Sequence, residues 1–505
     1  MRVLLLGYET EGCSLAYLSE LLEADGHDAI LAHCDYYIFI DDNHIKKFYR
    51  QRGFTGYVTF EDEYKTLYDK EWNVDWEYLE SFERLLTKSK NLQQLVLTDP
   101  ILSRNHHFRY PYLTPLESRE QVFYWAERLI RWTIDVIESY EPDVVLTYGR
   151  NYFVKNVVAQ IAASTELPMF TLLRSRIGGY CHLTRNFGLG TDPDLVDKLD
   201  DPANWPDINE AKEYVSSFRA STDEGGLYDA RSQRRIVDKE LFSFSEIISD
   251  FARNTGKIAL KSLLRNKRKY NGRVFATNYF NSHTPSVLGF HARIAYNSLR
   301  YLWEDLFTRT VPDRPFVYVP LHTLPESSTL TLSTEYYEAD LVRFMAKELP
   351  ASIDIAVKEN PNMIGTRPFS YYEALAKIPN VHLIDPTVQS KRLIREARGV
   401  CGISGTALLE AAILDTPTHH FGCPEFDAVL DYKGHDEFSQ FASACADGRA
   451  SRHSERVERY IQYVVNEGRE IPITCVRTDP GSRSWEKGTR AVYELFEPRA
   501  TEALS

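Results

Sequence analysis

The sequence predicts an α/β protein with two Rossmann-like domains, and three observations carry this prediction. The chain has 505 residues, more than a single hydrophobic core usually serves. Short apolar runs alternate with amphipathic segments at the N-terminus, and the same alternation returns near residue 300. Because such alternation is typical of parallel strands joined by helices, we expect two sheets in tandem that enclose a cleft.

The first series begins at residue 2. RVLLLG is predicted to be a strand, SLAYLSELLEADGH an amphipathic helix and DAILAHC a second strand. Residues 36–117 are aromatic, charged and irregular, and we interpret them as a partly helical insertion. A long helix at about 118–140 resumes the pattern, followed by a strand, a helix and a strand in PDVVLTYG, NYFVKNVVAQIAAS and LPMFTLL. From about 192 to 272 the chain is charged and mostly helical.

The second series runs from a strand expected in FVYVPLH to a final strand expected in THHFG. Between them, strands in SIDIAVKENP, VHLID and GVCGIS alternate with helices in EADLVRFMAKELP, SYYEALAKIP, SKRLIREAR and GTALLEAAILD. We therefore expect an N-terminal domain at 1–290 and a C-terminal domain at 291–480. The amphipathic tail, 481–505, is expected to form a helix that packs back onto one of the two domains.

Composition and charge exclude several classes of protein. The formal net charge of -13 argues against nucleic acid as the main partner. The seven cysteines are scattered and form no CxxC pair, so we predict neither a zinc site nor a disulfide framework, and a cytoplasmic location. The N-terminal apolar run VLLL is too short for a signal peptide, and no stretch approaches the roughly 20 apolar residues that span a bilayer.

The densest basic run of the chain is KSLLRNKRKYNGR, residues 261–273. Such a run is most often a solvated helix face. The alternative is a patch that binds anionic lipid head groups or a phosphorylated acceptor, because its positive charge stands out in an acidic chain. In that case the protein would associate peripherally with the inner face of the cell membrane.

A turn between a predicted strand and a predicted helix is the strongest candidate for a ligand site. In GVCGISGTALLEAAILD, Ser404, Gly405 and Thr406 lie where the helix begins, at free backbone N–H groups and the positive end of the helix dipole. Small residues there let a phosphate approach, and the hydroxyls can donate hydrogen bonds to it. Glu410 follows one turn later, and its carboxylate can accept hydrogen bonds from a pair of ribose hydroxyls. The alternative is that Ser404 or Thr406 caps the helix and Glu410 only stabilises its positive end.

Two further stretches follow predicted strands of the second domain. KENPNMIGTRP places Lys358 at a strand end and Arg367 on the loop after it, and two cations at the carboxyl edge of a sheet suit an anionic ligand. VPLHTLPESST places His322 and Glu326 after another strand, and we take both as candidates for nucleotide binding, although a lone histidine after a strand is more often structural than catalytic. Neither half carries GxGxxG or GxxxxGK[ST], so the sequence supports neither a dinucleotide site nor a P-loop.

The order of these motifs resembles that of the capsule polysaccharide biosynthesis glycosyltransferases, a family that includes the Kdo transferases of capsule and lipopolysaccharide assembly. The series is PLHTLPESST, KENPNMIGTRP, IPNVHLIDP, SGTALLEA and FG within about 316–422, with fainter support from RIGGYCHLTRNFGLG. The resemblance implies a two-domain GT-B fold whose C-terminal domain holds a nucleotide sugar and whose N-terminal domain holds the acceptor. It also implies contacts to the donor nucleotide and its phosphate from Lys358, Ser404, Gly405, Thr406 and Glu410.

One position departs from the family pattern. Where the family usually has histidine, in Lys-Glu-His-Pro, this chain has Asn360. An amide can donate a hydrogen bond to a phosphate, but it supplies neither a proton nor a positive charge. If the family histidine acts as a charged clamp, this protein has weaker assistance to the leaving group or a different donor.

Glycosyl transfer requires stabilisation of a leaving phosphate and, for inversion, a base for the acceptor hydroxyl. The predicted helix start, Lys358 and Arg367 could carry the first task without a metal, and no Asp-x-Asp pair ends a predicted strand, so we expect neither a metal nor another cofactor. YETEG, the loop after the first strand, offers Glu9 and Glu11 as the base, and we favour Glu11 because it adjoins Gly12. The alternative is that both are ordinary exposed loop carboxylates.

These motifs predict a glycosyltransferase that moves a sugar from a nucleotide donor to a surface polysaccharide or its lipid-linked precursor. The resemblance to the family implies a nucleotide monophosphate donor such as CMP-Kdo. The enzymatic alternative is a CDP-glycerol-type polyol phosphate transferase with the same fold. The non-enzymatic alternative is a capsule polysaccharide assembly or export factor whose transferase site has decayed, and Asn360 gives this alternative some support.

Overall fold

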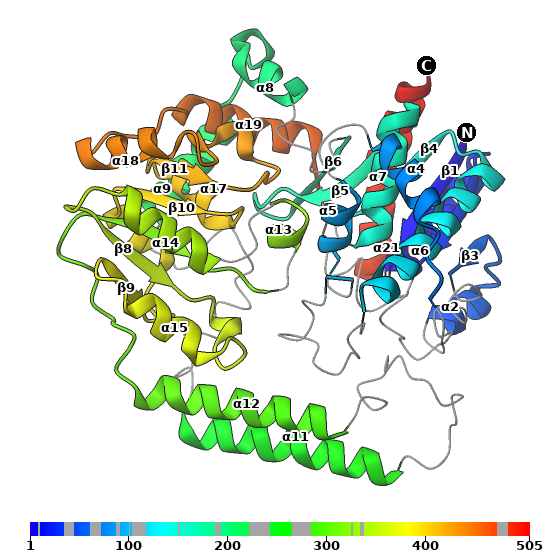
Figure 1. Ribbon diagram of the computed structural model, residues 1–505. Helices are drawn as coiled ribbons and strands as arrows, with labels where there is room; N and C mark the ends of the chain where they lie inside the picture. Colours follow the sequence, from blue (N-terminus) through cyan, green and yellow to red (C-terminus); the bar gives the residue numbers. More distant parts are fainter. Residues whose placement is uncertain are drawn as a thin grey trace. The chain divides into compact units, whose positions relative to one another are not determined.

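The computed structural model divides the chain into two α/β units (Figure 1). Unit 1 comprises Met1–Leu189 and Val464–Ser505, and unit 2 comprises Gly190–Asn266 and Thr284–Tyr463. The α/β fold class with two Rossmann-like sheets is confirmed. The structure describes the whole chain except residues 9–10, 35–44, 61–71, 87–90, 100–101, 104–117, 150–151, 186, 188–192, 222–242, 265–283, 325–326, 334–337 and 472–482.

Unit 1 is built on a seven-stranded sheet in the order β13-β6-β5-β4-β1-β2-β3. The five strands from β5 to β3 are parallel, whereas the β5–β6 and β6–β13 pairs are antiparallel. The order reverses between β1 and β4, which makes the carboxyl ends of these strands a topological switch point. The strands are β1 (Arg2–Gly7), β2 (Asp28–His33), β3 (Tyr57–Thr59), β4 (Val144–Tyr148), β5 (Met169–Arg174), β6 (Tyr180–Thr184) and β13 (Arg469–Glu470).

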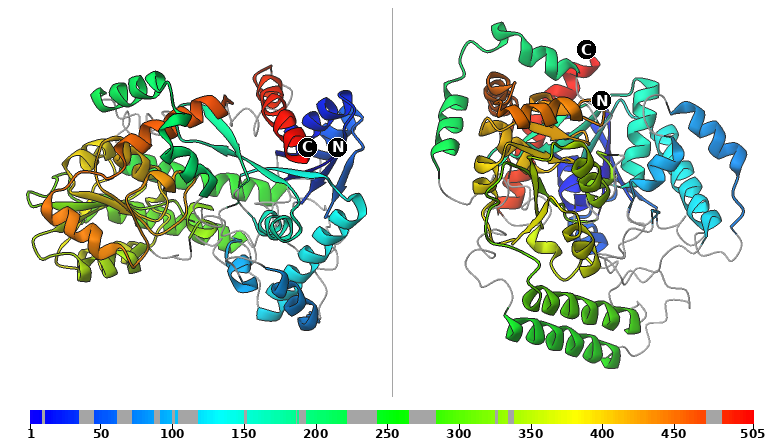
Figure 2. Two further views of the ribbon diagram at one scale, coloured as in Figure 1. Left: turned by 90° about the horizontal axis from the view of Figure 1, so that it is seen from above. Right: turned by 60° about the vertical axis from the view of Figure 1, so that its left-hand side comes forward.

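Hydrophobic clusters cover both faces of this sheet. Leu4 and Leu6 of β1 join the cluster on one face, whereas Val3 and Leu5 join the other, because successive strand side chains point to opposite faces. The C-terminal helix α21 packs on α1 in the second cluster, as the views in Figures 1 and 2 also show. The helices are α1 (Glu11–Ala24), α2 (Ile45–Arg52), α4 (Trp76–Leu85), α5 (Leu92–Leu97), α6 (Arg119–Tyr140), α7 (Phe153–Thr165) and α21 (Arg483–Leu504).

Unit 2 contains a six-stranded, fully parallel sheet in the order β12-β11-β10-β7-β8-β9. Its strands appear in the order third, second, first, fourth, fifth and sixth from the β9 edge, which is the doubly wound topology. β8 and β10 are buried along their whole length, as parallel strands between two helical layers are. The strands are β7 (Phe316–Pro320), β8 (Asp354–Lys358), β9 (Val381–Ile384), β10 (Gly399–Gly402), β11 (Thr418–His420) and β12 (Tyr432–Lys433).

Four described helices of unit 2, α8, α9, α11 and α12, precede its sheet in the chain, and α9 packs on α17. In α9, Arg219 Nε donates a hydrogen bond to the carbonyl of Ile413 in α17 at 2.6 Å. This contact places the charged segment with unit 2, so the division differs from the expected boundary between 290 and 291. The helices are α8 (Pro193–Asp200), α9 (Asn209–Ala220), α11 (Phe244–Leu264), α12 (Thr284–Trp303), α13 (Ser327–Leu330), α14 (Glu338–Glu348), α15 (Phe369–Ala376), α16 (Ser390–Glu396), α17 (Thr406–Ile413), α18 (Phe438–Asp447) and α19 (Ser454–Glu467).

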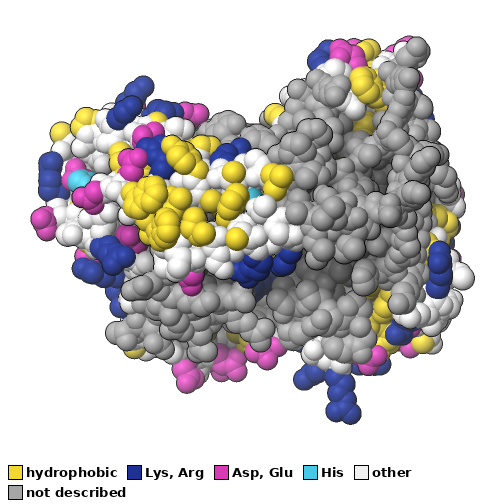
Figure 3. Space-filling view, turned by 90° about the horizontal axis from the view of Figure 1, so that it is seen from below, with side chains coloured by type: hydrophobic (Ala, Val, Ile, Leu, Met, Phe, Trp, Pro, Cys, Tyr) yellow, Lys and Arg dark blue, Asp and Glu magenta, His cyan; other side chains and the backbone are white. Residues whose placement is uncertain are grey.

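The helices α11 and α12 lie side by side as a hairpin-shaped arm (Figures 1 and 2). Phe244 and Trp303 stack with ring centroids 6.3 Å apart, and both are exposed. In the view from below, hydrophobic side chains gather in a patch on the described surface (Figure 3). From residue 265 onward the basic run lies outside the described residues, so its predicted role at a lipid surface stays a prediction. Within the described part of the chain, no helix is long and apolar enough to cross a membrane.

Candidate functional site

The carboxyl edge of the unit 2 sheet brings together the three stretches that the sequence singled out. β7 leads to His322, β8 ends at Lys358, and β10 leads to Ser404 and Gly405 at the start of α17. Because β7 pairs with both β8 and β10, these strand ends are neighbours. The edge coincides with the switch point between β7 and β10, and doubly wound sheets bind their ligands at such points.

The helix α17 begins at this edge without a side-chain cap. Gly405 is its N-cap residue and has no side chain, so the alternative in which Ser404 or Thr406 caps the helix is not realised. A Cβ atom at position 405 would lie 3.1 Å from His322 Nε2, so the approach of the ring favours glycine here. The first turn therefore presents backbone N–H donors and the positive end of the helix dipole without a competing cap.

His322 is buried beside this helix start and is held by a carboxylate that sequence reasoning missed. Its Nδ1 lies 2.8 Å from Oε1 of Glu338, the first residue of α14, and its backbone N–H donates to the same oxygen. The other ring nitrogen, Nε2, accepts a hydrogen bond from the backbone N–H of Ser404 at 3.5 Å. His322 therefore links the strand end of β7 to the start of α17.

Arg367 lies in the same buried cluster and is 2% exposed. Its Nη1 donates to Glu338 Oε2 at 3.0 Å, and its Nη2 donates to the His322 carbonyl at 2.8 Å. Its Nε lies 2.7 Å from Glu359 Oε2, an ion pair without hydrogen-bond geometry. The guanidinium thus joins the carboxylates of Glu338 and Glu359 to the loop after β7. For Glu359, the signal in the sequence was its position directly after Lys358.

The two carboxyl groups of the cluster differ in their acidity. Burial opposes the ionisation of Glu338, but Arg367 and His322 outweigh it and lower the pKa of this carboxyl. Burial raises the pKa of Glu359, and the opposing effects of Arg367 and Tyr372 are too weak to cancel it. The two directions differ because His322 also stabilises the ionised form of Glu338, whereas the charge of Glu338 itself opposes the ionisation of Glu359.

We expect Glu359→Gln to weaken the pH dependence of stability above the ordinary glutamate pKa of 4.5. A carboxyl whose pKa is raised in the folded protein contributes stability when protonated, and this contribution is lost as the pH rises through the folded pKa. Glutamine cannot ionise, yet it keeps an acceptor for the Tyr372 hydroxyl, which lies 2.6 Å from Glu359. The free energy of unfolding in urea, compared at pH 5 and pH 8, measures the effect.

Glu338→Gln is the matched contrast for this prediction. Because the pKa of Glu338 is lowered, its contribution is present above pH 4.5 and is lost as the pH falls. This variant should therefore lose stability at pH 8, where Glu359→Gln should not. Equal pH slopes for the wild type and Glu359→Gln would contradict the assignment.

Lys358 and Glu410 complete the described part of the edge. Lys358 is 8% exposed, and its Nζ donates to Ser390 Oγ, the first residue of α16, at 2.8 Å. Glu410 is 5% exposed and contributes to the raised pKa of Tyr318, for which burial is the main cause. Both charged groups are thus enclosed around the strand ends, where a ligand with phosphate and ribose groups would find complementary chemistry.

Asn360 has a local structural task. Its side-chain oxygen accepts a hydrogen bond from the backbone of Asn362 at 3.0 Å and caps the short 3₁₀ turn after β8. The amide at this position therefore shapes the loop that leads to Arg367. Glu326 and Glu9 both lie outside the described residues, so their predicted roles stay predictions.

The preferred base, Glu11, lies at the switch point of unit 1. It opens α1 and is 5% exposed, with Oε2 placed 2.9 Å from Nζ of Lys155, a fully buried residue of α7. Lys155 also donates to the carbonyl of Tyr148 at the end of β4. Glu11 is therefore not an ordinary exposed loop carboxylate, and Gly12 beside it is close-packed in the helix, where a Cβ would meet His33 and Tyr49.

The backbone at this switch point is strained. Tyr152, the N-cap residue of α7, has φ 74° and ψ 148°, a region that glycine normally occupies. Its ring stacks on Tyr8 with centroids 4.3 Å apart, and Tyr8 follows β1. Strain of this kind persists where the surrounding packing holds it, and it is concentrated at functional sites. The carboxyl ends of β1 and β4 are therefore a second candidate site, in unit 1.

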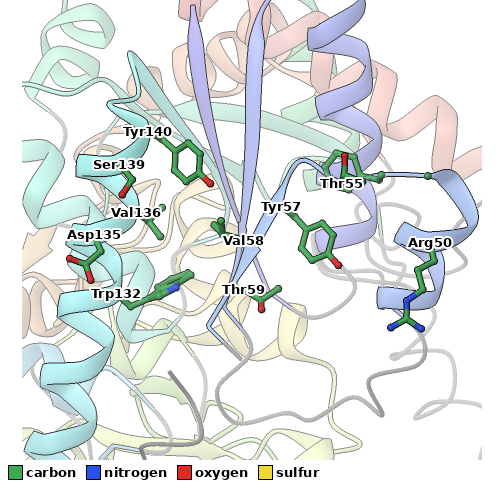
Figure 4. A pocket seen from close by; sticks show the side chains of 12 residues that line it. Arg50, Thr55, Tyr57, Val58, Thr59, Trp132, Asp135, Val136, Ser139 and Tyr140 are labelled. Atoms are coloured by element: carbon green, nitrogen blue, oxygen red, sulfur yellow. The ribbon is translucent and has the colours of Figure 1, made fainter. Parts of the chain in front are cut away.

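A cavity of about 920 Å³ lies elsewhere in unit 1, at the β3 edge of its sheet (Figure 4). Trp132, Asp135 and Tyr140 of α6 face it from one side, and Tyr57 of β3 and Arg50 of α2 border it on the other. None of the predicted site residues lines this cavity. Among the described residues, no group of three His, Cys, Asp or Glu side chains is placed to hold a metal ion.

Of the known proteins compared with this chain, only solved structures show similarity to it. No family model matches the sequence, and no curated protein matches it. UDP-GlcNAc 2-epimerase from Neisseria meningitidis, solved with UDP-GlcNAc, is 11% identical, with a TM-score of 0.27 over 92% of this chain and 99% of that chain. The beta Kdo 2,4 transferase of Thermosulfurimonas dismutans KpsC is 12% identical, with a TM-score of 0.30 over 65% of this chain and 93% of that chain.

A Streptomyces glycosyltransferase, SsfS6, is 11% identical, with a TM-score of 0.22 over 92% of this chain and 96% of that chain. Identities and TM-scores of this size assign no residue and no activity to this chain. The assignments that follow therefore rest on the geometry of the two sheets and on the order of the sequence motifs.

Proposed function

We propose that the protein is a glycosyltransferase that binds a nucleotide-sugar donor at the carboxyl edge of the unit 2 sheet. The observation that carries this proposal is the uncapped start of α17 at the β7–β10 switch point, with the buried His322 directed at it. Lys358 lies at the neighbouring strand end. The order of the motifs, which resembles the capsule polysaccharide glycosyltransferases, supports sugar transfer over other uses of a nucleotide.

Different residues at the carboxyl edge of the unit 2 sheet bind different parts of the donor. The backbone N–H groups at Gly405 and Thr406 bind the donor phosphate, and Lys358 contributes positive charge to it. Glu410 binds the ribose hydroxyls. Arg367 is enclosed by two carboxylates, so we assign it to holding His322 in place instead of contacting the ligand. As the bond between sugar and phosphate breaks, these donors stabilise the charge left on the phosphate oxygen.

A nucleotide panel tests the proposal. The melting temperature should rise with one of CMP, CDP, UDP or GDP, because a ligand at 100 times its Kd stabilises the folded state by about 2.7 kcal/mol. A response to CMP would favour a CMP-sugar donor such as CMP-Kdo, whereas a response to CDP alone would favour the polyol phosphate transferase. No response to any nucleotide would overturn the proposal and favour the assembly or export factor.

Glu410→Ala should weaken nucleotide binding by about 1.5–3 kcal/mol, roughly 10- to 150-fold in Kd, because a charged acceptor for the ribose hydroxyls is lost. Isothermal titration with the nucleotide found in the panel measures this change. Glu396→Ala is the matched control, since Glu396 is an exposed glutamate of α16 paired with Arg392. Unchanged affinity in Glu410→Ala would show that this glutamate only stabilises the helix start.

We further propose a surface polysaccharide or its lipid-linked precursor as the acceptor, with the basic run at 261–273 as the contact to an anionic membrane. The exposed Phe244 and Trp303 of the arm suit the interfacial region of a bilayer. Vesicles that contain anionic lipid should sediment the wild-type protein. Neutralising Lys267, Arg268 and Lys269 should release it to the supernatant, and a failure of the wild type to sediment would refute this contact.

A further inference from the structure

The cavity in unit 1 follows the outer edge of β3, the last strand of the sheet (Figure 4). Val58 packs against the hydrophobic cluster on one face of the sheet, whereas Tyr57 packs against the cluster on the other face. Because both residues line the cavity, it reaches both faces of the sheet around this edge. Its volume of about 920 Å³ falls within the range of about 300–1,000 Å³ that small-molecule sites have.

Helix α6 contributes one continuous stripe of its surface to this cavity. The stripe consists of Trp132, Asp135, Val136, Ser139 and Tyr140, and spacings of three and four residues place them on one face of the helix. Trp132 and Val136 are buried, whereas Asp135 and Ser139 are exposed. Trp132 and Tyr140 project from α6 toward β3 (Figure 4). The stripe therefore combines an apolar floor with a polar rim.

Three aromatic side chains of the cavity are held by their neighbours. Trp132 packs edge to face against the buried Phe60, with ring centroids 5.6 Å apart. Tyr57 is half-buried and stacks on Phe54 with centroids 6.1 Å apart. Tyr140 is half-buried against the hydrophobic cluster beneath α6. Rings that are already held in place offer flat contact area to a ligand at a low cost in conformational entropy.

The polar groups of the rim are available to a ligand. Asp135, Ser139 and Tyr140 make no side-chain hydrogen bond or ion pair with any residue that the structure describes, and the same holds for the guanidinium of Arg50 across the cavity. Asp135 and Arg50 are the charged residues in the described part of the lining, so its formal charges cancel. The rim thus offers one acceptor group, one donor group and hydroxyls without a net charge.

This combination of groups favours a neutral, polyhydroxylated ring as the ligand. A sugar ring carries C–H bonds on its faces, and these pack on aromatic rings, whose faces carry negative partial charge. Its hydroxyls donate to a carboxylate and accept from a guanidinium. A nucleotide would bring its phosphate charge close to the carboxylate of Asp135. A purely apolar ligand would desolvate the polar rim without giving it hydrogen bonds.

A peptide that adds a strand to β3 is the competing occupant, and the backbone of this edge disfavours it. A strand added at a sheet edge depends on a row of main-chain hydrogen bonds. β3 has only three residues. The backbone N–H of Tyr57 already donates to the carbonyl of Thr55 at 2.8 Å, so it is engaged within its own chain. The side chains of the cavity therefore offer a ligand more than the backbone of β3 does.

We propose that the cavity at the β3 edge binds a segment of a neutral oligosaccharide. Sugar faces pack on Trp132 and Tyr57, and Asp135 accepts hydrogen bonds from sugar hydroxyls. Sugar binding follows from the cavity itself, whereas the further step, that the segment belongs to the acceptor polysaccharide, deepens the proposed function and rests on it. A polysaccharide held here would remain on the protein when its end leaves the site of transfer.

Isothermal titration of the full chain with maltohexaose, cellohexaose and chitohexaose, without nucleotide, tests the proposal. At least one of these neutral hexasaccharides should bind. Asp135→Ala should weaken its affinity about tenfold, because a charged acceptor is lost. Tyr140→Ala should weaken it about two- to tenfold, because flat contact area is lost.

Two other residues of α6 supply the matched controls. Glu138 is exposed and Tyr124 is half-buried against the same hydrophobic cluster, and neither lines the cavity. Glu138→Ala and Tyr124→Ala should therefore keep the affinity of the wild type. Urea unfolding of all four variants identifies any loss of affinity that comes from a loss of folding.

The outcomes separate this inference from the proposed function. Absence of binding by all three hexasaccharides would overturn the inference, and binding of a random hexapeptide library in their place would favour an added strand. Affinity unchanged in Asp135→Ala and Tyr140→Ala, or weakened equally in the two controls, would also overturn it. Hexasaccharide binding by a protein that responds to no nucleotide would support the sugar site and overturn its role in holding an acceptor.

Discussion

Replacing Lys155 with methionine should lower the free energy of unfolding of unit 1 by about 3–5 kcal/mol, the usual cost of removing one partner from a buried ion pair. Lys155 is fully buried, and its Nζ lies 2.9 Å from Glu11 Oε2. Methionine fills a similar volume but leaves the Glu11 carboxylate enclosed without a cation. It also removes the donor to the Tyr148 carbonyl. Urea unfolding followed by the fluorescence of the buried Trp125 and Trp485 measures the loss.

The double replacement of Glu11 by leucine and Lys155 by methionine is the control. Since an apolar pair often replaces a buried ion pair at little cost, the double variant should recover most of the stability that Lys155→Met loses. A single variant within about 1 kcal/mol of the wild type would contradict the account of this pair. The role of Glu11 as a base is tested separately, because normal turnover in Glu11→Gln would exclude it.

Replacing Arg367 with methionine should cost a similar amount, about 3–5 kcal/mol in unit 2, and should also abolish nucleotide binding. The reason is that Glu338 and Glu359 share this one guanidinium, and its loss leaves both carboxyls buried without it. The His322 carbonyl loses its donor as well. Urea unfolding at pH 7.5 and calorimetric titration of the nucleotide measure the two effects.

Arg343→Met is the matched control for this prediction. Arg343 pairs with Asp340 at 2.8 Å on the surface of α14, and its side chain is 48% exposed. An exposed pair contributes at most about 1 kcal/mol, so this variant should stay close to the wild type. If Arg367→Met were no more destabilising than Arg343→Met, the buried cluster would not hold the site together.

Much of the fold could be predicted because the strands of both units are continuous apolar runs. The segments around Leu4, Val145 and Ile355 are buried on both faces, so their hydrophobicity alone marks them as parallel strands. β3 could not be predicted in this way. It has three residues, lies inside the segment that we expected to be an insertion, and is a strand only because β2 pairs with it.

Some parts of the candidate site could be predicted from the sequence and others could not, and the difference has a physical reason. The start of α17 was found because a strand, small residues and a helical pattern are adjacent in the sequence. Glu338 and Lys155 were missed because their importance comes from burial against partners 16 and 144 residues away. Arg367 was predicted to face a ligand, and its enclosure by two carboxylates could not be read from a loop sequence that resembles any solvated loop.

The most direct test of the central claim is a crystal structure of the protein with the nucleotide that stabilises it in the thermal-shift panel. The account predicts that the phosphate lies on the backbone N–H groups of Gly405 and Thr406. It predicts that the ribose hydroxyls lie on Glu410. A nucleotide bound away from the β7–β10 switch point, with the start of α17 left empty, would contradict it.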